Sequence, residues 1–67
     1  MNFKITGEFI ELAKLLKAAG LCESGGQAKF LIAQGQVKVD GQIEIQKGRK
    51  IHRGQIVEIS GEKIKIA

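Results

Sequence analysis

The chain has 67 residues, enough for one small domain and too few for a second hydrophobic core. Eleven Lys and Arg against seven Asp and Glu give a net charge of +4, which suggests an anionic partner without requiring one. Cys22 is the only cysteine and His52 the only histidine, so an intramolecular disulfide is excluded and a zinc site lacks ligands. We therefore expect neither a metal nor a cofactor.

The apolar residues are too dispersed for a membrane segment. The longest apolar run, 30–33, is far below the ~20 residues that cross a bilayer, so no membrane partner is expected. The N-terminus lacks the unbroken apolar core of a signal peptide. One unpaired thiol without a secretion signal is typical of a reducing compartment, and the expected location is the cytoplasm.

The N-terminal third predicts a short strand and a helix. Residues 2–5 alternate between polar and apolar and form a candidate strand. Residues 8–19 carry apolar side chains at helical spacing, with Glu11 and Lys14 placed as an i,i+3 ion pair. Gly20 is expected to end this helix.

Residues 24–41 carry the strongest local signals. Ser24 and Gln27 have the spacing of a capping box, and Gly35 stands where a helix C-terminus favours glycine. The period then changes to two at 36–39, as in a half-buried strand, and 40–41 is an Asp-Gly turn dipeptide. The segment therefore predicts a capped helix, a corner, a strand and a tight turn.

The C-terminal third predicts further strands. Residues 42–45 should pair with 36–39, residues 46–53 form a basic loop anchored by Ile51, and 55–60 and 62–67 are two more strands. The expected fold is α+β: two consecutive helices followed by a small antiparallel sheet of about four strands, with a candidate N-terminal strand. One domain is expected to span 1–67.

Catalytic residues are not evident. The carboxylates that would have to pair for acid–base chemistry are expected in turns or outward strand positions, and these are Glu23, Asp40, Glu44 and Glu58. His52 is distant in sequence from both Ser24 and Cys22, so no nucleophile–base pair is indicated. We predict a protein that is not an enzyme and has no small-molecule substrate.

Two features suit a polyanion. Gly25 and Gly26 leave backbone N–H groups uncovered at a helix N-terminus, with Lys29 one turn on, which fits either a phosphate site or a loosely specified turn beside a solvated lysine. Four cations fall within 47–53, with no acid from 46 to 57, although an ordinary solvated loop is the alternative. Lys38 is expected on the outward strand face, where an exposed lysine usually serves solubility.

The pattern Ser-x-x-Gln-Ala-Lys-x-Leu-Ile-x-x-Gly-x-Val-x-Val-Asp-Gly of residues 24–41 resembles the RNA-binding domain of small-subunit ribosomal protein four, the alpha-L RNA-binding motif. This domain recurs in pseudouridine synthases, tyrosyl-tRNA synthetases and heat-shock ribosome-rescue proteins. The similarity covers about residues 8–60 and looks closest to the small stand-alone bacterial members. Gly25 stands where the family commonly has Arg, and Gln55 where it usually has Asp.

The resemblance implies a function and a site. Members of this family present the capped helix and the following strand to RNA, flanked by the basic loop, which implies one continuous patch of cations. The RNA-binding residues implied are Ser24, Gly25, Gly26, Gln27, Lys29, Lys38, Lys47, Arg49, Lys50 and Arg53. The implied partner is structured RNA, ribosomal or transfer RNA, with the ribosome or its assembly intermediates as the setting.

The way in which RNA is read can be narrowed. There is no Trp or Tyr, and Phe3 and Phe9 are expected in the core, so base-stacking platforms are scarce. Phe30 is expected to pack at the edge of the core, with base stacking as the alternative. The remaining mode of RNA recognition is contact with phosphate and ribose groups, combined with recognition of the shape of a folded RNA. A protein-interaction adaptor that attaches through its sheet is the second hypothesis, and DNA binding is the third.

Overall fold

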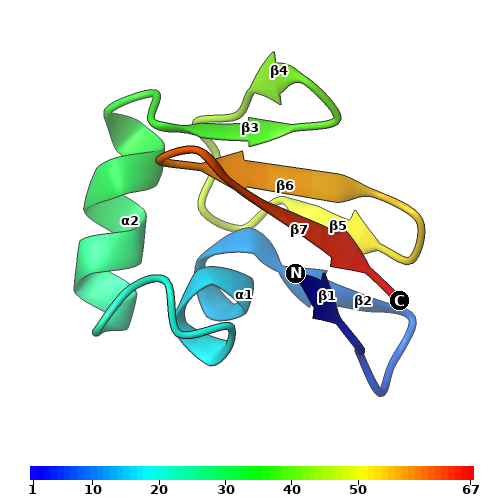
Figure 1. The fold of residues 1–67 in the computed structure, drawn as a ribbon. Helices are drawn as coiled ribbons and strands as arrows, with labels where there is room; N and C mark the ends of the chain where they lie inside the picture. Colours follow the sequence, from blue (N-terminus) through cyan, green and yellow to red (C-terminus); the bar gives the residue numbers. More distant parts are fainter.

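The computed structural model describes residues 1–67 and contains two helices and seven strands (Figure 1). Five strands form a sheet in the order β1-β7-β6-β3-β4, and β2 pairs with β5 in a separate two-stranded ribbon. The elements are β1 (Asn2–Phe3), β2 (Phe9–Glu11), α1 (Leu12–Ala18), α2 (Gly25–Ala33), β3 (Val37–Val39), β4 (Gln42–Ile43), β5 (Lys50–His52), β6 (Ile56–Ile59) and β7 (Glu62–Ile66). The α+β class is confirmed, but β1 runs parallel to β7, so the sheet is mixed.

The first helix starts later than its apolar spacing predicts. Residues 9–11 form β2 and pair antiparallel with β5, inside the segment expected to be a loop. In this ribbon Ile10 lies opposite Ile51, and both turn toward the core. Helix α1 then begins at Leu12, where carbonyl oxygens of the 47–49 segment accept its first N–H groups. Long-range pairing therefore overrides the helical spacing at these three residues.

The local signals around α2 are confirmed. The Ser24 hydroxyl accepts a hydrogen bond from the Gln27 N–H at 3.1 Å, and the Gln27 side chain accepts from the Glu23 N–H at 2.7 Å, one residue before the cap. Gly35 has φ +75° and donates to the Ile32 carbonyl at 3.1 Å, as in a Schellman C-terminus. The helix that the sequence predicts is therefore fixed at both ends.

Two tight hairpins have positive φ at both turn residues, as a type I′ turn requires. One is Asp40-Gly41 between β3 and β4, and the other is 60–61 between β6 and β7. The Asp40 carboxylate also accepts hydrogen bonds from the Ile56 N–H and the Gln55 side-chain amide, both at 2.9 Å. Gln55 therefore has a structural role, fixing the first hairpin to the start of β6.

The Asp40 contacts predict a pH-dependent stability. Hydrogen bonds from the Ile56 N–H, the larger cause, and from the Gln55 amide lower the pKa of Asp40 in the folded state. The stability that Asp40 contributes is therefore complete above its unfolded pKa of about 3.9 and is lost as the pH falls through its lower folded pKa. We expect the free energy of unfolding, measured with urea, to fall below about pH 4, and to fall less in Asp40→Asn. Glu62→Gln, an exposed carboxylate in β7, should keep the wild-type profile; an unchanged profile in Asp40→Asn would contradict the assignment.

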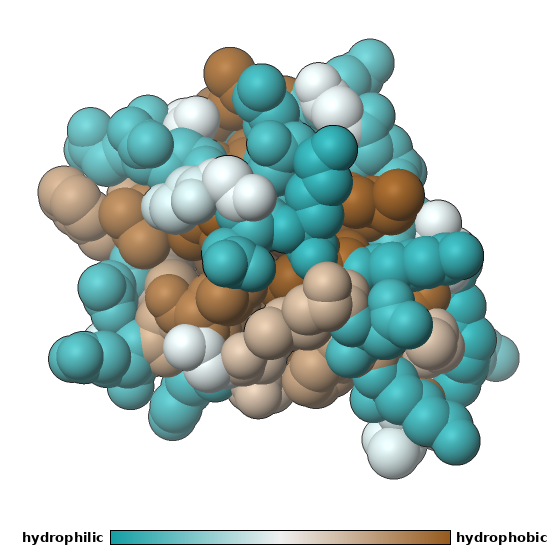
Figure 2. Space-filling model, in the orientation of Figure 1, coloured by the Kyte–Doolittle hydropathy of each residue, from teal (hydrophilic) through white to brown (hydrophobic).

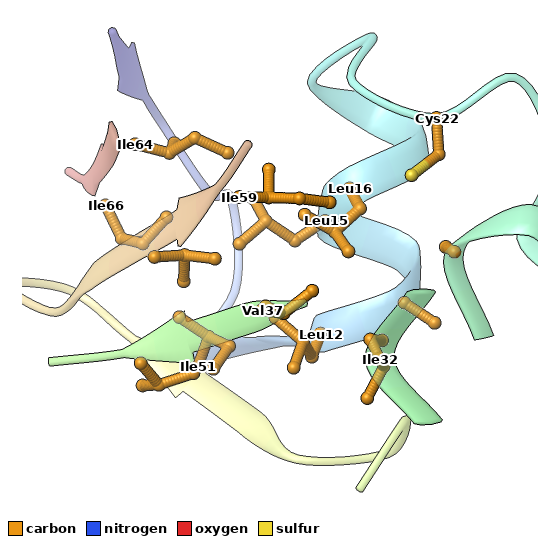
Figure 3. Packing of buried hydrophobic residues seen from close by; sticks show 14 of the residues in the cluster. Leu12, Leu15, Leu16, Cys22, Ile32, Val37, Ile51, Ile59, Ile64 and Ile66 are labelled. Carbon is orange, nitrogen blue, oxygen red and sulfur yellow. The ribbon is translucent and has the colours of Figure 1, made fainter. Parts of the chain in front are cut away.

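The core lies between the two helices and the inner face of the sheet, and its 15 buried residues are all apolar. Figure 3 shows Leu12, Leu15 and Leu16 of α1 directed at side chains from α2 and the strands. Ile51 of β5 is fully buried, so the expected anchor of the basic segment is confirmed. Neither helix is long and apolar enough to span a membrane.

Two of the three phenylalanines are placed differently from expectation. Phe3 packs partly buried against the core, as predicted, but Phe9 is 40% exposed and Phe30 is 62% exposed. Phe9 belongs to a strand rather than to the helical stripe that suggested burial, and Phe30 points away from the buried face of α2. The face of the molecule drawn in Figure 2 shows apolar areas between hydrophilic side chains.

Candidate nucleic-acid interface

A groove of about 410 Å³ lies where α1, the N-terminus of α2 and the loop 44–49 meet. We call it the lysine groove, because four of its side chains are lysines and one is a carboxylate. Its lining residues are Glu11, Ala13, Lys14, Lys17, Gly25, Lys29, Lys47 and Gly48. The lysines come from three separate segments of the chain, so the fold, rather than any one stretch of sequence, assembles this cationic surface.

The helices set the positions of three of these lysines. Lys14 and Lys17 lie one turn apart on the exposed side of α1, and Lys29 follows Gly25 by one turn on α2. The two helices pack against each other, which turns these side chains toward one groove. The expected Glu11–Lys14 pair forms at 3.7 Å, but the Lys14 side chain is 74% exposed, so the ion pair is weak and its charge stays available.

The loop 44–49 is held by Glu44, whose sequence position predicts a solvated strand residue. Its side chain is only 12% exposed, and it accepts hydrogen bonds from the next two backbone N–H groups and from Arg49. The Gln46 N–H is the largest cause of its lowered pKa. The loop also contacts α1: the Lys47 carbonyl accepts a hydrogen bond from the Ala13 N–H at 3.1 Å, and the Arg49 carbonyl accepts one from the Leu12 N–H at 2.9 Å. Lys47 is thereby fixed beside the start of α1.

The N-terminus of α2 is open to a ligand. The Gly25 and Gly26 N–H groups donate to no protein atom, whereas the next N–H is taken by Ser24. A Cβ at Gly25 would meet no atom within 4 Å, and one at Gly26 would meet only the Ser24 hydroxyl at 3.8 Å. The fold therefore does not require either glycine, although each is a poor helix former. Free N–H groups at the positive end of a helix dipole favour an anion.

The structure brings some of the predicted cations together and separates others. Lys29 and Lys47 share the lysine groove with Gly25, next to the exposed cap residues Ser24 and Gln27. Lys38 lies elsewhere, on the outer face of the sheet. The single continuous patch is therefore divided, and contact of any of these residues with RNA stays a prediction.

The cations of 49–53 lie in and beside β5 and make different contacts. Arg49 is turned to Glu44 and lines a second pocket beside the β3–β4 hairpin. Lys50 has its Nζ 4.9 Å from the centroid of the Phe9 ring, and the Arg53 guanidinium donates to a backbone carbonyl of the N-terminal segment at 3.1 Å. Each cation thus has a different partner, so closeness in sequence does not make them one patch.

Two groove residues are not singled out by the sequence. Lys14 and Lys17 fit the solvated side of an amphipathic helix, and in the structure Lys17 lies in the last turn of α1, where a cation is favourable to the helix dipole. Their i,i+3 spacing places both on one side of α1, which is the one available signal. Only the packing of α1 beside α2 shows that this side faces the Gly25 end.

These features define a small α+β domain with a cationic groove at a helix N-terminus. The chain belongs to the S4 domain family, whose model matches residues 3–67, so the resemblance found in the sequence is confirmed. The "Putative RNA-binding protein YbcJ" of Escherichia coli is 51% identical over 57 residues, covering 85% of this chain and 81% of that protein. Its solution structure matches with a TM-score of 0.76 and 45% identity over 98% of this chain and 85% of the other, and is described as revealing an alpha-L motif involved in RNA binding.

Two further relatives differ in size. The "Probable ribosome maturation protein RlbA" of Bacillus subtilis is 39% identical over 57 residues, covering 85% of this chain and 80% of that protein. A tyrosine–tRNA ligase of Ralstonia nicotianae is 42% identical over 62 residues, which are 92% of this chain and only 16% of the ligase. The relatives of comparable length are thus named for RNA binding and ribosome maturation, and the enzyme match is confined to one part of the ligase.

Proposed function

We propose that this chain is a non-catalytic RNA-binding module that recognises structured RNA, either ribosomal or transfer RNA. The observation that carries the proposal is the lysine groove, in which Lys14, Lys17, Lys29 and Lys47 surround the open α2 terminus at Gly25. Four cations and uncovered N–H groups in one concave surface suit phosphate groups held at fixed spacing. The whole of 1–67 acts as one RNA-binding domain.

The relatives support the choice of RNA over other polyanions. YbcJ is named for RNA binding and RlbA for ribosome maturation, and both resemble this chain over most of their length. We infer that the RNA belongs to the ribosome or to its assembly intermediates. The match to the ligase spans too little of that enzyme to carry its catalytic activity here. A reducing cytoplasm suits this setting and the unpaired thiol of Cys22.

Gly25 is compatible with this function despite standing where the resembling family commonly has Arg. The positive charge that an Arg would supply at this position comes instead from Lys29 and Lys47, which reach the same groove from neighbouring segments. Without a side chain at Gly25, a phosphate is free to approach the backbone N–H groups directly. The contact at the helix end is then made by the backbone, and the charge is supplied from beside it.

Salt dependence of binding tests the proposal. If the four groove lysines each contact a phosphate, log K for a duplex RNA hairpin should fall with log salt at a slope of roughly −3 to −4, since each contact contributes about −0.9. Fluorescence anisotropy between about 50 and 200 mM KCl measures the slope. A duplex DNA of the same length is the control and should bind more weakly. Affinity for RNA that is independent of salt would reject the proposal.

A second candidate function is a protein-interaction adaptor, favoured by exposed isoleucines in β4, after β4 and in β6. Ile43, Ile45 and Ile56 are between 42% and 65% exposed. Such side chains suit a protein partner better than a phosphate backbone. Co-purification of a protein that survives nuclease treatment would support this candidate, and its loss after nuclease would favour RNA.

A further inference from the structure

Phe9 is an aromatic side chain on the outside of the molecule. It opens β2, where alternation turns Ile10 inward and leaves Phe9 on the solvent face of the β2–β5 ribbon, 40% exposed. Its neighbours on this face of the ribbon are polar or charged, with His52 opposite and Lys50 and Glu11 beside it.

Two side chains of β5 accompany the Phe9 ring. His52 lies opposite Phe9 in the ribbon, with the ring centroids 6.0 Å apart and the planes tilted by 53°. The Lys50 Nζ lies 4.9 Å from the Phe9 centroid, within the range of a cation–π contact. An aromatic pair flanked by a cation is a surface suited to a flat, electron-rich ring that is attached to an anionic chain.

A depression of about 260 Å³ adjoins this surface. Phe9 lines it together with Phe3, Ile10 and the segment 4–7. The Arg53 guanidinium donates to the carbonyl of Ile5, within that lining segment, so a second cation lies beside the depression. Four of its seven lining residues are apolar, Lys4 is the charged residue among them, and Arg53 lies beside it.

The aromatic surface continues into the lysine groove. Glu11 lies opposite Lys50 in the ribbon and also lines the groove beside Lys14. Phe9 and Glu11 are two residues apart on the same face of β2, a separation of about 7 Å along the strand. One strand of RNA is therefore able to touch both surfaces.

From these contacts we propose that Phe9 and His52 stack an unpaired nucleobase of the RNA whose phosphates occupy the lysine groove. The inference rests on the proposed function and narrows its ligand to RNA with an unpaired nucleotide beside a helical stem. Lys50 and Arg53 hold the phosphates that flank this base. An apolar protein segment is a poorer occupant, because it would have to desolvate these cations without offering them a partner.

The test uses two RNA hairpins with the same stem, one blunt and one with a single-stranded extension that contains 2-aminopurine. The wild-type chain should prefer the extended hairpin by roughly five- to hundredfold, and its binding should change the 2-aminopurine fluorescence. Phe9→Leu should abolish the preference and the fluorescence change, whereas affinity for the blunt hairpin should stay the same. Phe9→Trp should restore both.

Phe30→Leu is the matched control, because Phe30 is more exposed than Phe9 and lies on α2, away from the β2–β5 ribbon. This variant should show the wild-type preference and fluorescence change. His52→Ala removes an exposed side chain and should weaken the preference even if Phe9→Leu impairs folding. Equal affinity of the wild type for both hairpins, or a preference kept in His52→Ala and Phe9→Leu, would overturn the stacking site alone. If the wild-type chain shows no salt-dependent binding to the blunt hairpin, the proposed function is overturned as well.

Discussion

Replacing Lys29 and Lys47 together by Gln is expected to weaken binding of a structured RNA by roughly 10- to 30-fold, and replacing Lys14 and Lys17 as well by roughly 100- to 1000-fold. Each exposed lysine that binds a phosphate is taken to contribute about 1 kcal/mol, and about 1.4 kcal/mol is tenfold in affinity. The salt slope should also become shallower by about 0.9 for each phosphate that the variant no longer binds. Anisotropy titrations at three salt concentrations measure both quantities.

The matched control removes the same charge from another place. Lys63 and Lys65 are exposed on β7, on the sheet face that carries Lys38, and neither lines the lysine groove. Their double replacement by Gln should lower affinity only slightly and leave the salt slope nearly unchanged. Equal losses in the two double variants would mean that binding follows net charge, and would remove the groove as the site.

The elements predicted correctly are those specified by neighbouring residues. Ser24, Gln27 and Gly35 act within one helix, and the Asp-Gly turn at 40–41 fixes its hairpin through positive φ values alone. Each of these signals acts over at most a few residues, so it needs no knowledge of the rest of the chain. The fold class follows from the order of such elements, and it is confirmed.

The elements that local patterns miss depend on contacts between distant residues. Residues 9–11 have a spacing compatible with both helix and strand, and their pairing with β5 decides the outcome. The parallel pairing of β1 with β7 likewise joins the two ends of the chain (Figure 1). The exposed position of Phe9 is a consequence of the first of these pairings, and no local pattern indicates it.

The candidate site shows the same division more sharply. The four cations at 47–53 look like one patch in the sequence, but Lys47 lines the lysine groove, Arg49 turns to Glu44, and Lys50 and Arg53 lie near Phe9 and the depression that it lines. Lys14 and Lys17, by contrast, look like ordinary helix charges and supply two of the four lysines of the groove. Charge clustering along the chain is therefore a weaker guide to the interface than the packing of α1 against α2.

Replacing Glu44 separates the effect of net charge on RNA affinity from the effect of the loop geometry that Glu44 maintains. Removing a carboxylate near a polyanion site should, on Coulombic grounds alone, strengthen RNA binding. Glu44, however, fixes the loop 44–49 through the next two N–H groups and Arg49, and that loop places Lys47 and accepts the first N–H groups of α1. Glu44→Ala should therefore weaken RNA binding several-fold, despite making the chain more positive.

The same substitution should reduce the free energy of unfolding by about 1–3 kcal/mol, because it removes the hydrogen bonds that a charged carboxylate accepts from two backbone N–H groups and Arg49. For a domain of this size the melting temperature should fall by about 4–8 °C for each kcal/mol. Glu44→Gln should be intermediate, since its amide oxygen still accepts from the backbone. Glu62→Ala removes an equal charge from an exposed position on β7 and should leave stability unchanged while leaving binding equal or slightly tighter. If Glu44→Ala instead melts as wild type and binds more tightly, the loop does not need this carboxylate, and Lys47 is placed by other contacts.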